Sequence, residues 1–192
     1  MDNSIALTLT RRYWPQADTR IRDLLLVAGG SLLVAALAQV RIPLPFTPVP
    51  LTGQTFGVLL VGAALGSRRG AASLALYLVS GLAGLPVFTG WGSGISHLAG
   101  PTGGYLIGFI AAAFAVGWLC ERKLDRRWTT ALLPFLAGEA LIYAFGLPWL
   151  AVYVGANNAL AAGFIPFLPG DVAKLILAAL ALPAVWSFME GK

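Results

Sequence analysis

The chain has 192 residues, of which 58% are hydrophobic and only 11% are charged, and its formal net charge is +5. An average soluble domain carries about 25% charged residues, so this composition excludes an ordinary soluble protein and indicates an integral membrane protein. The single cysteine, Cys120, excludes an intramolecular disulfide and a metal site built from cysteine pairs.

The N-terminal region lacks the features of a cleavable signal peptide. Its first twenty residues contain several arginines and a proline, and they lack an apolar core. We expect residues 1–21 to form a cytoplasmic or interfacial segment around Tyr13 and Trp14. Residues 22–192 are then expected to form one membrane domain.

Long apolar runs predict membrane-spanning helices of about 20 residues each. One further apolar run is shorter than 20 residues, and we expect it to cross the membrane as well. The six expected spans cover approximately residues 22–40, 53–66, 70–89, 102–120, 131–153 and 171–189. The sequence therefore predicts an all-α integral membrane protein, folded as a six-helix bundle.

The basic residues predict the orientation of this bundle. They gather in the N-terminal segment and in two short loops, at 67–69 and 121–128, all on the same side of the expected spans. The opposite side holds Arg41 and Lys174. The positive-inside rule then places both termini in the cytoplasm, and no feature of the sequence indicates nucleic-acid binding.

Three long loops on the outer side are rich in glycine and proline, at about 41–55, 84–105 and 157–170. Four prolines in the first loop fix an extended backbone that cannot be helical, and the glycines permit tight turns. Irregular backbone near a membrane is tolerated where it is buried in protein or lines a polar cavity. These loops therefore predict a lidded pocket that opens to the outside.

Two groups of polar side chains lie in or at the start of apolar spans, where a charged side chain is energetically unfavourable. Asp171 and Lys174 share one helix face at the start of the last span, and such pairs at membrane depth usually face a cavity or a partner. Alternatively, Asp171 caps the helix and Lys174 snorkels to the headgroups. Glu139, four residues before Tyr143, is protonated, paired with the tyrosine hydroxyl, or part of the site.

The remaining motifs speak against catalysis. The glycines at 100–104 lack a following Lys-Ser/Thr and do not follow a strand, which excludes a phosphate-binding loop. Gly103 either permits close helix packing or contacts a ligand through its backbone. His97 lies in a loop with Ser93 and Ser96, without metal-ligand spacing or a nucleophile elbow, and is expected to be solvated. We expect no enzyme activity, no metal and no cofactor.

Small residues recur in the expected spans 22–40 and 102–120. Such residues let helices approach closely, either within the bundle or at the surface where another membrane subunit docks.

Four motifs stand in order along the chain. They are Pro43-x-Pro45-x-Thr47-Pro48-Val49-Pro50-x-Thr52-x-Gln54-Thr55, Gly84-Leu85-Pro86-Val87-Phe88, Gly100-Pro101-Thr102-Gly103-Gly104-Tyr105-Leu106-x-Gly108-Phe109 and Pro169-Gly170-Asp171-x-x-Lys174. Together they resemble the BioY family, whose members are the biotin-specific substrate-binding subunits (S components) of energy-coupling factor (ECF) transporters.

This resemblance implies a six-helix bundle that holds one biotin near its outer face, with Asp171 and Lys174 in the binding site. A carboxylate suits the ureido N–H donors of biotin, an ammonium suits its valerate, and an aromatic ring could pack the bicyclic ring. Which charge meets which end stays open. The candidate site residues are Asp171, Lys174, Phe88, Thr89, Trp91, Ser93, Gly100, Gly103, Tyr105, Gln54, Glu139 and Tyr143.

The resemblance further implies high-affinity biotin uptake across the cytoplasmic membrane of a prokaryote. Because the chain has no Walker motif, it would need a transmembrane coupling (T) subunit and two ATP-binding-cassette ATPases as partners. The alternative is a self-sufficient facilitator or an ion-coupled carrier, with Glu139 and Asp171 as coupling groups. A membrane enzyme is disfavoured because no catalytic constellation is present.

Overall fold

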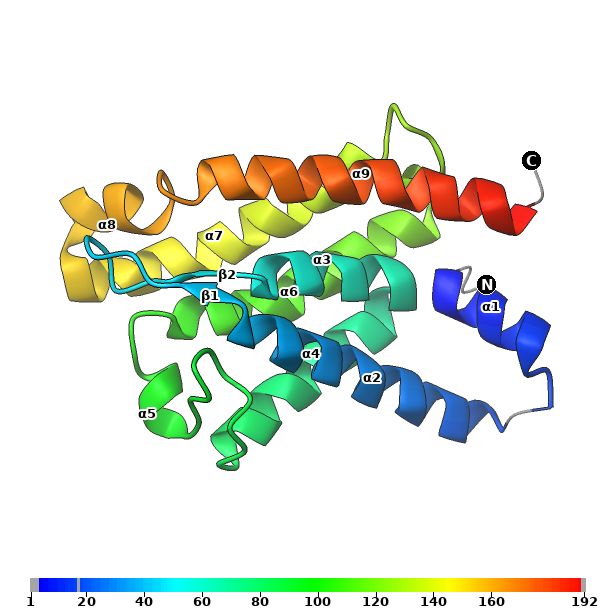
Figure 1. Cartoon of the computed structure of the whole chain (residues 1–192), viewed down its shortest axis with the longest axis horizontal. Coiled ribbons are helices and arrows are strands. Elements are labelled where there is room, and N and C mark those ends of the chain that lie inside the picture. Colours follow the sequence, from blue (N-terminus) through cyan, green and yellow to red (C-terminus); the bar gives the residue numbers. More distant parts are fainter. Residues whose placement is uncertain (1–3, 17, 191–192) are drawn as a thin grey trace.

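A computed structural model describes residues 4–16 and 18–190 of the chain. Long helices run roughly along one axis, and both ends of the chain lie at one end of the bundle (Figure 1). The described elements are α1 (Ile5–Tyr13), α2 (Thr19–Gln39), β1 (Arg41–Ile42), β2 (Leu51–Thr52), α3 (Gln54–Leu65), α4 (Ser67–Leu82), α5 (Ile95–Leu98), α6 (Gly103–Glu121), the 3-10 helix η1 (Leu124–Arg126), α7 (Leu132–Val154), α8 (Ala156–Gly163) and α9 (Leu168–Glu190).

Each of the six expected spans contains one helix: α2, α3, α4, α6, α7 and α9. Of these, α2, α6, α7 and α9 are long and apolar enough to cross a membrane. Helix α3 has only 12 residues, which at about 1.5 Å per residue gives roughly 18 Å against a hydrocarbon core of about 30 Å. The fold is therefore all-helical, with four strongly apolar spans and shorter helices beside them.

Helix α4 is shifted relative to the predicted span 70–89. It begins at Ser67, so the expected loop 67–69 is its first turn. The Glu121 carboxylate accepts a hydrogen bond from the Ser67 backbone N–H at 2.7 Å and so satisfies a free amide of that turn. The helix ends at Leu82, because Gly84 follows with a φ of +99°.

The N-terminal segment is attached to the bundle rather than separate from it. Ile5 and Leu7 of α1 are buried in the core, whereas Tyr13 and Trp14 are exposed, as an interfacial location would require. Helix α2 begins before the predicted residue 22, because the Asp18 side chain accepts a hydrogen bond from the Arg20 N–H at 2.7 Å and caps the helix.

Helix α6 is the most buried of the four long spans and packs against α3, α4 and α7. Its small residues permit this packing: a Cβ atom added at Gly104 would lie 2.3 Å from the Trp149 Cβ. On α2, a Cβ atom at Gly30 would lie 2.6 Å from the Ser73 Oγ, and Ser31 is buried. These small residues thus pack helices of this chain together.

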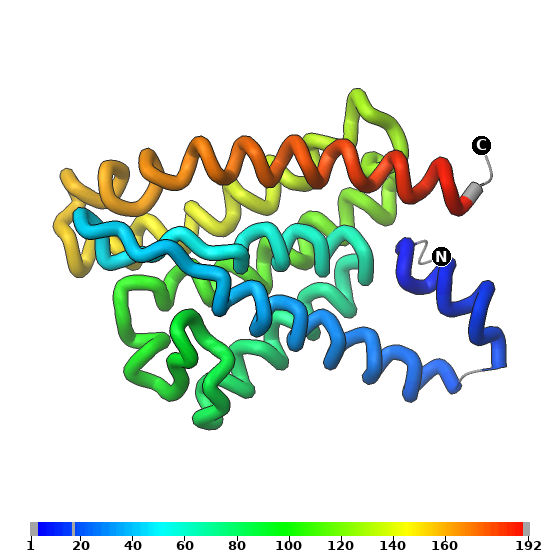
Figure 2. Tube along the Cα trace, viewed as in Figure 1, coloured from blue at the N-terminus to red at the C-terminus, as the bar shows by residue number. Residues whose placement is uncertain are grey.

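The long loops gather at the bundle end opposite the two termini (Figure 2). The proline-rich loop is extended, as predicted, and forms a short antiparallel hairpin in which Arg41 pairs with Thr52. The Thr47 hydroxyl donates to the Ala162 carbonyl of α8 at 2.7 Å. The loop before α6 is held by the Trp149 indole N–H, which donates to the Gly100 carbonyl at 2.9 Å. These anchors fix the loops around one volume.

Candidate functional site

A pocket lies beneath these loops, where the hairpin and the start of α3 meet α6, α7 and the start of α9. It encloses about 580 Å³ of empty space, the part open to solvent included. Its lining residues are Val49, Pro50, Thr52, Gln54, Thr55, Thr89, His97, Thr102, Tyr105, Leu106, Phe109, Ile142, Tyr143, Gly163, Phe167, Asp171 and Lys174. The wall is thus mainly apolar, with a few polar groups that converge from distant parts of the chain.

The charged pair of α9 lies inside this pocket. Asp171 is only 4% exposed, and one of its carboxylate oxygens accepts a hydrogen bond from the Lys174 ammonium at 3.0 Å. The Tyr143 hydroxyl of α7 donates to the other oxygen. Asp171 therefore binds side chains and not the free amides of its helix, so it is not a helix cap.

The Lys174 ammonium points into the bundle. Besides Asp171 it donates to the Thr55 hydroxyl at 2.9 Å and to the Thr52 carbonyl at 3.2 Å. The ammonium lies against the start of α3, so Lys174 does not snorkel to the headgroups and that alternative is wrong. It also brings the first and last predicted motifs together.

Gln54 joins the first outer loop to the third span. Its amide N–H₂ donates to the buried Tyr77 hydroxyl at 2.7 Å. Its amide oxygen accepts from the Thr89 hydroxyl at 2.7 Å and from the Thr52 hydroxyl at 3.3 Å. The network holds two pocket-lining threonines in place through one amide.

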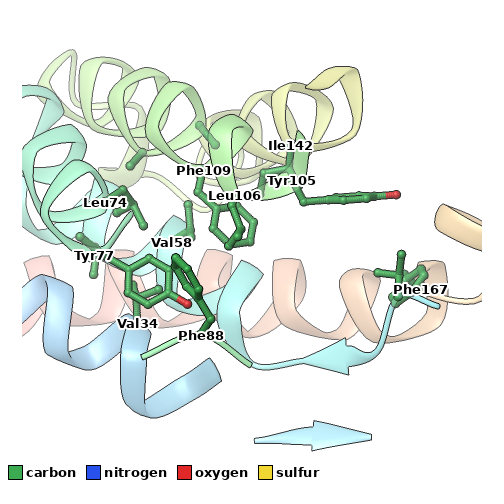
Figure 3. Close-up of a cluster of buried hydrophobic side chains, with 14 of the residues drawn as sticks. Val34, Val58, Leu74, Tyr77, Phe88, Tyr105, Leu106, Phe109, Ile142 and Phe167 are labelled. Carbon is green, nitrogen blue, oxygen red and sulfur yellow. The ribbon is translucent and has the colours of Figure 1, made fainter. Parts of the chain in front are cut away.

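Aromatic rings form much of the apolar wall. The Tyr105 hydroxyl donates to the Gly163 carbonyl at 3.0 Å, which fixes its ring. The Tyr143 ring packs edge-on against Phe164, with centroids 4.8 Å apart. Tyr105 and Phe167 lie at the same end of the buried cluster, with Ile142 beside Tyr105 (Figure 3). These rings give the pocket an apolar wall that suits the apolar part of a small ligand.

His97 lines the pocket instead of being solvated, as had been expected from its loop position. Its imidazole stacks on the Phe88 ring, with centroids 5.0 Å apart. Burial lowers the pKa of this imidazole below its ordinary value of 6.5. Burial thus favours the neutral imidazole of His97 over the cationic form.

Half of the predicted site residues line the pocket, and half do not. The pocket residues are Gln54, Thr89, Tyr105, Tyr143, Asp171 and Lys174. Of the others, Phe88 is fully buried against the Tyr77 ring, and Trp91 is 70% exposed. Ser93 is half-buried outside the lining. Neither aromatic ring is therefore placed to pack a molecule inside the pocket.

Gly100 and Gly103 serve the packing of the loop before α6. The Gly100 carbonyl accepts the indole N–H of Trp149. A Cβ atom at Gly103 would lie 1.8 Å from the Leu98 carbonyl oxygen, so only glycine fits there. Of the two roles open for Gly103, the structure shows the packing role.

Glu139 lies on α7 outside the pocket lining. It is 6% exposed, and neither carboxylate oxygen has a hydrogen-bond partner within the described residues. The expected alternative of a pair with the Tyr143 hydroxyl is wrong, because that hydroxyl donates to Asp171.

Several residues of the lining were not predicted from the sequence. Thr52 and Thr55 stand in the first motif, two and one residues from the chosen Gln54, so a signal was present. Phe109 ends the third motif, so a signal was present there too, whereas Ile142 lies on the buried face of an apolar span, where the sequence offers no signal. Within residues 4–16 and 18–190, no cluster of three or more His, Cys, Asp or Glu side chains could hold a metal ion.

The fold and the pocket define a helical membrane protein with a site for one small, partly polar solute. The sequence model of the BioY family matches residues 9–191, so the chain belongs to the BioY family. Members of this family are substrate-binding components of transporters, and the chain is accordingly not an enzyme.

Individual relatives agree with this assignment. The chain is 38% identical over 168 residues to the biotin transporter BioY of Rhizobium etli, covering 83% of this chain and 90% of that one. It is 40% identical over 156 residues to the BioY of Thermotoga maritima, covering 81% and 91%. A crystal structure of the S-component for biotin from an ECF-type ABC transporter matches with a TM-score of 0.79 and 28% identity, covering 89% of this chain and 95% of that one. The fold is thus an S-component fold.

Proposed function

We propose that this chain binds one biotin molecule in the pocket and serves as the substrate-specificity subunit for its high-affinity uptake. The observation that carries the proposal is the buried Asp171–Lys174 pair, 3.0 Å apart, within an aromatic wall. The relatives named as biotin transporters support the choice of ligand.

Asp171 is suited to the ureido end of biotin. Each of its oxygens accepts one hydrogen bond from the described residues, from Tyr143 and from Lys174. An ionised carboxylate can accept about four hydrogen bonds, so acceptor capacity is left for the two ureido N–H groups. These bonds to a charged acceptor are stronger than bonds between neutral groups.

Lys174 is suited to the valerate end. Its three N–H groups already donate to Asp171, Thr55 and Thr52, so the valerate must take the place of one acceptor. The longest of these bonds, at 3.2 Å, goes to the neutral Thr52 carbonyl. Exchanging a neutral carbonyl for a carboxylate strengthens the bond, because both partners are then charged.

The tyrosines and Phe109 are suited to the apolar middle of the ligand. Tyr105 and Tyr143 lie with ring centroids 6.3 Å apart, nearly perpendicular to each other. A thioether sulfur packs favourably at the edge of such rings.

For transport, we propose that the chain works in the cytoplasmic membrane of a prokaryote with a T subunit and two ATP-binding-cassette ATPases. Residues 22–192 form one domain with six crossings, in which α3 and α4 are the short ones. Both termini face the cytoplasm, because the arginines concentrate on their side. The pocket, at the opposite end of the bundle, then opens outward.

One observation favours a second candidate, an ion-coupled or self-sufficient carrier. The Glu139 carboxylate, which has no hydrogen-bond partner among the described residues, would be the coupling group of such a carrier at membrane depth. Uptake of labelled biotin by cells that lack their own biotin transporter separates the two functions. Cells with the chain, the T subunit and both ATPases should accumulate biotin, and accumulation should stop when the ATPases carry inactive Walker motifs. Full accumulation by the chain alone would contradict the S-component function.

A further inference from the structure

Glu139 lies on α7 directly below the pocket. It precedes the pocket residues Ile142 and Tyr143 by three and four positions, so the three share one face of the helix. It is 6% exposed, and both of its carboxylate oxygens are buried without a hydrogen-bond partner among the described residues. Nothing in the proposed biotin site uses this group.

The surroundings of Glu139 contain few charges. From α9, the charges of Asp171 and Lys174 act on it, and on α7 itself Tyr143 follows it by one helical turn. Helix α3 has no titratable residue, and neither does α8. The other titratable groups with described side chains on elements packed against α7 are Tyr105 at the pocket, Cys120 and Glu121 at the end of α6, and Asp125 and Arg126 of η1.

The protonation state of Glu139 thus depends on the charges of Asp171 and Lys174 on α9. An ionised carboxylate without donors is costly in this interior, whereas a protonated one is tolerated. The ammonium of Lys174 favours the ionised form, and the carboxylate of Asp171 opposes it. An anionic ligand beside Lys174 adds a second negative charge, and this shifts Glu139 toward the protonated form.

We infer that Glu139 is a proton-binding site beneath the pocket, and that an anionic ligand bound in the pocket draws a proton from solvent onto its carboxylate. The inference rests on the proposed function in taking biotin as that ligand. No covalent bond other than the O–H bond changes, and the proton comes from water or buffer.

This linkage has a definite sign. The ligand-bound protein carries more protons than the free protein, so acid favours binding and alkali opposes it. With one linked proton, the Kd rises by at most about tenfold per pH unit, and only in the pH range where Glu139 is protonated with ligand bound but ionised without it.

The test is calorimetric titration of the purified full chain with biotin, in buffers of different ionisation enthalpy, at several pH values across neutrality. The wild type should take up protons as it binds. Glu139→Gln, which keeps the shape, should bind biotin without proton uptake. The matched control is Asp18→Asn, which makes the same kind of exchange at the exposed N-cap carboxylate of α2, and this variant should still take up protons as it binds. Biotinamide, which is uncharged, should draw fewer protons than biotin.

The outcomes separate the two proposals. Biotin binding without proton uptake, or uptake that persists in Glu139→Gln, overturns the linkage and leaves the biotin site standing. Absence of biotin binding overturns both. If Glu139→Gln does not fold, infrared difference spectra of the wild type decide: biotin should produce the carbonyl band of a protonated carboxylic acid, and a spectrum without that band refutes the inference.

Discussion

Lys174→Met tests the proposed valerate contact most sharply. The substitution keeps the length and the apolar stem of the side chain but removes the ammonium and its three donated bonds, at 2.9, 3.0 and 3.2 Å. Removing one partner of a desolvated charge contact costs about 2 to 5 kcal/mol. At about 1.4 kcal/mol per tenfold, biotin binding should weaken by about 30-fold to about 4,000-fold.

Calorimetry with two ligands assigns this loss to the valerate. Biotinamide lacks the carboxylate charge, so it should bind the wild type more weakly than biotin does. In Lys174→Met the two ligands should bind almost equally, because the group that distinguishes them is gone. Lys123→Met is the matched control, since Lys123 is exposed at the opposite end of the bundle and should not alter binding.

Loss of structure is the competing explanation for weak binding. The variant leaves the Asp171 carboxylate buried without its cation, and this can reduce stability. Thermal unfolding in detergent must therefore accompany each titration. If a folded Lys174→Met variant loses equal affinity for biotin and biotinamide, the ammonium shapes the pocket without meeting the valerate, and our assignment is refuted.

Three further changes probe the ureido contact, the aromatic wall and the topology. Asp171→Asn should weaken the binding of biotin and biotinamide alike, by about 30-fold or more, because both ligands carry the ureido ring. Gly146→Ala places a Cβ atom 2.3 Å from the pocket tyrosine of α6, and should lower both stability, by about 1 to 3 kcal/mol, and biotin affinity. In a background without the native cysteine, a cysteine at Ser96 should react with an impermeant maleimide in intact cells, and one at Trp128 should not.

Each of these has its own control or contrary outcome. Near-normal biotin binding by a folded Asp171→Asn variant would show that the ureido ring contacts other residues. Gly29→Ala, where a Cβ atom meets nothing within 4 Å, should change stability by no more than about 1 kcal/mol in titrations run beside Gly146→Ala. The reverse labelling pattern, with Trp128→Cys reactive and Ser96→Cys protected, would place the pocket on the cytoplasmic side.

The architecture was largely predictable because its determinants are local. Length and composition mark the long spans, prolines at near-alternating positions fix the extended loop, and an i,i+3 spacing puts Asp171 and Lys174 on one helix face. The error in the predicted helix bounds also has a local cause. The span at 70–89 ends early at Leu82, because apolar residues continue past the positive-φ Gly84 into the loop.

The site was predictable only where a residue's chemistry is unusual for its position. Charged groups in apolar spans stood out: Asp171 and Lys174 line the pocket, whereas Glu139 lies outside its lining. The direction of a loop side chain is a tertiary property, so the sequence could not show that Trp91 is exposed while the nearby His97 points inward. Likewise, Ile142 resembles any other apolar residue of a span until α6 is packed against α7.

The central claim is that biotin occupies the pocket between the hairpin and the starts of α3 and α9. A crystal structure of the wild-type chain with biotin tests it directly. The account predicts one biotin in this pocket, with its ureido N–H groups within hydrogen-bond distance of the Asp171 carboxylate and its valerate within hydrogen-bond distance of the Lys174 ammonium. Biotin bound elsewhere on the molecule, or a pocket without biotin in crystals grown at saturating biotin, would contradict it.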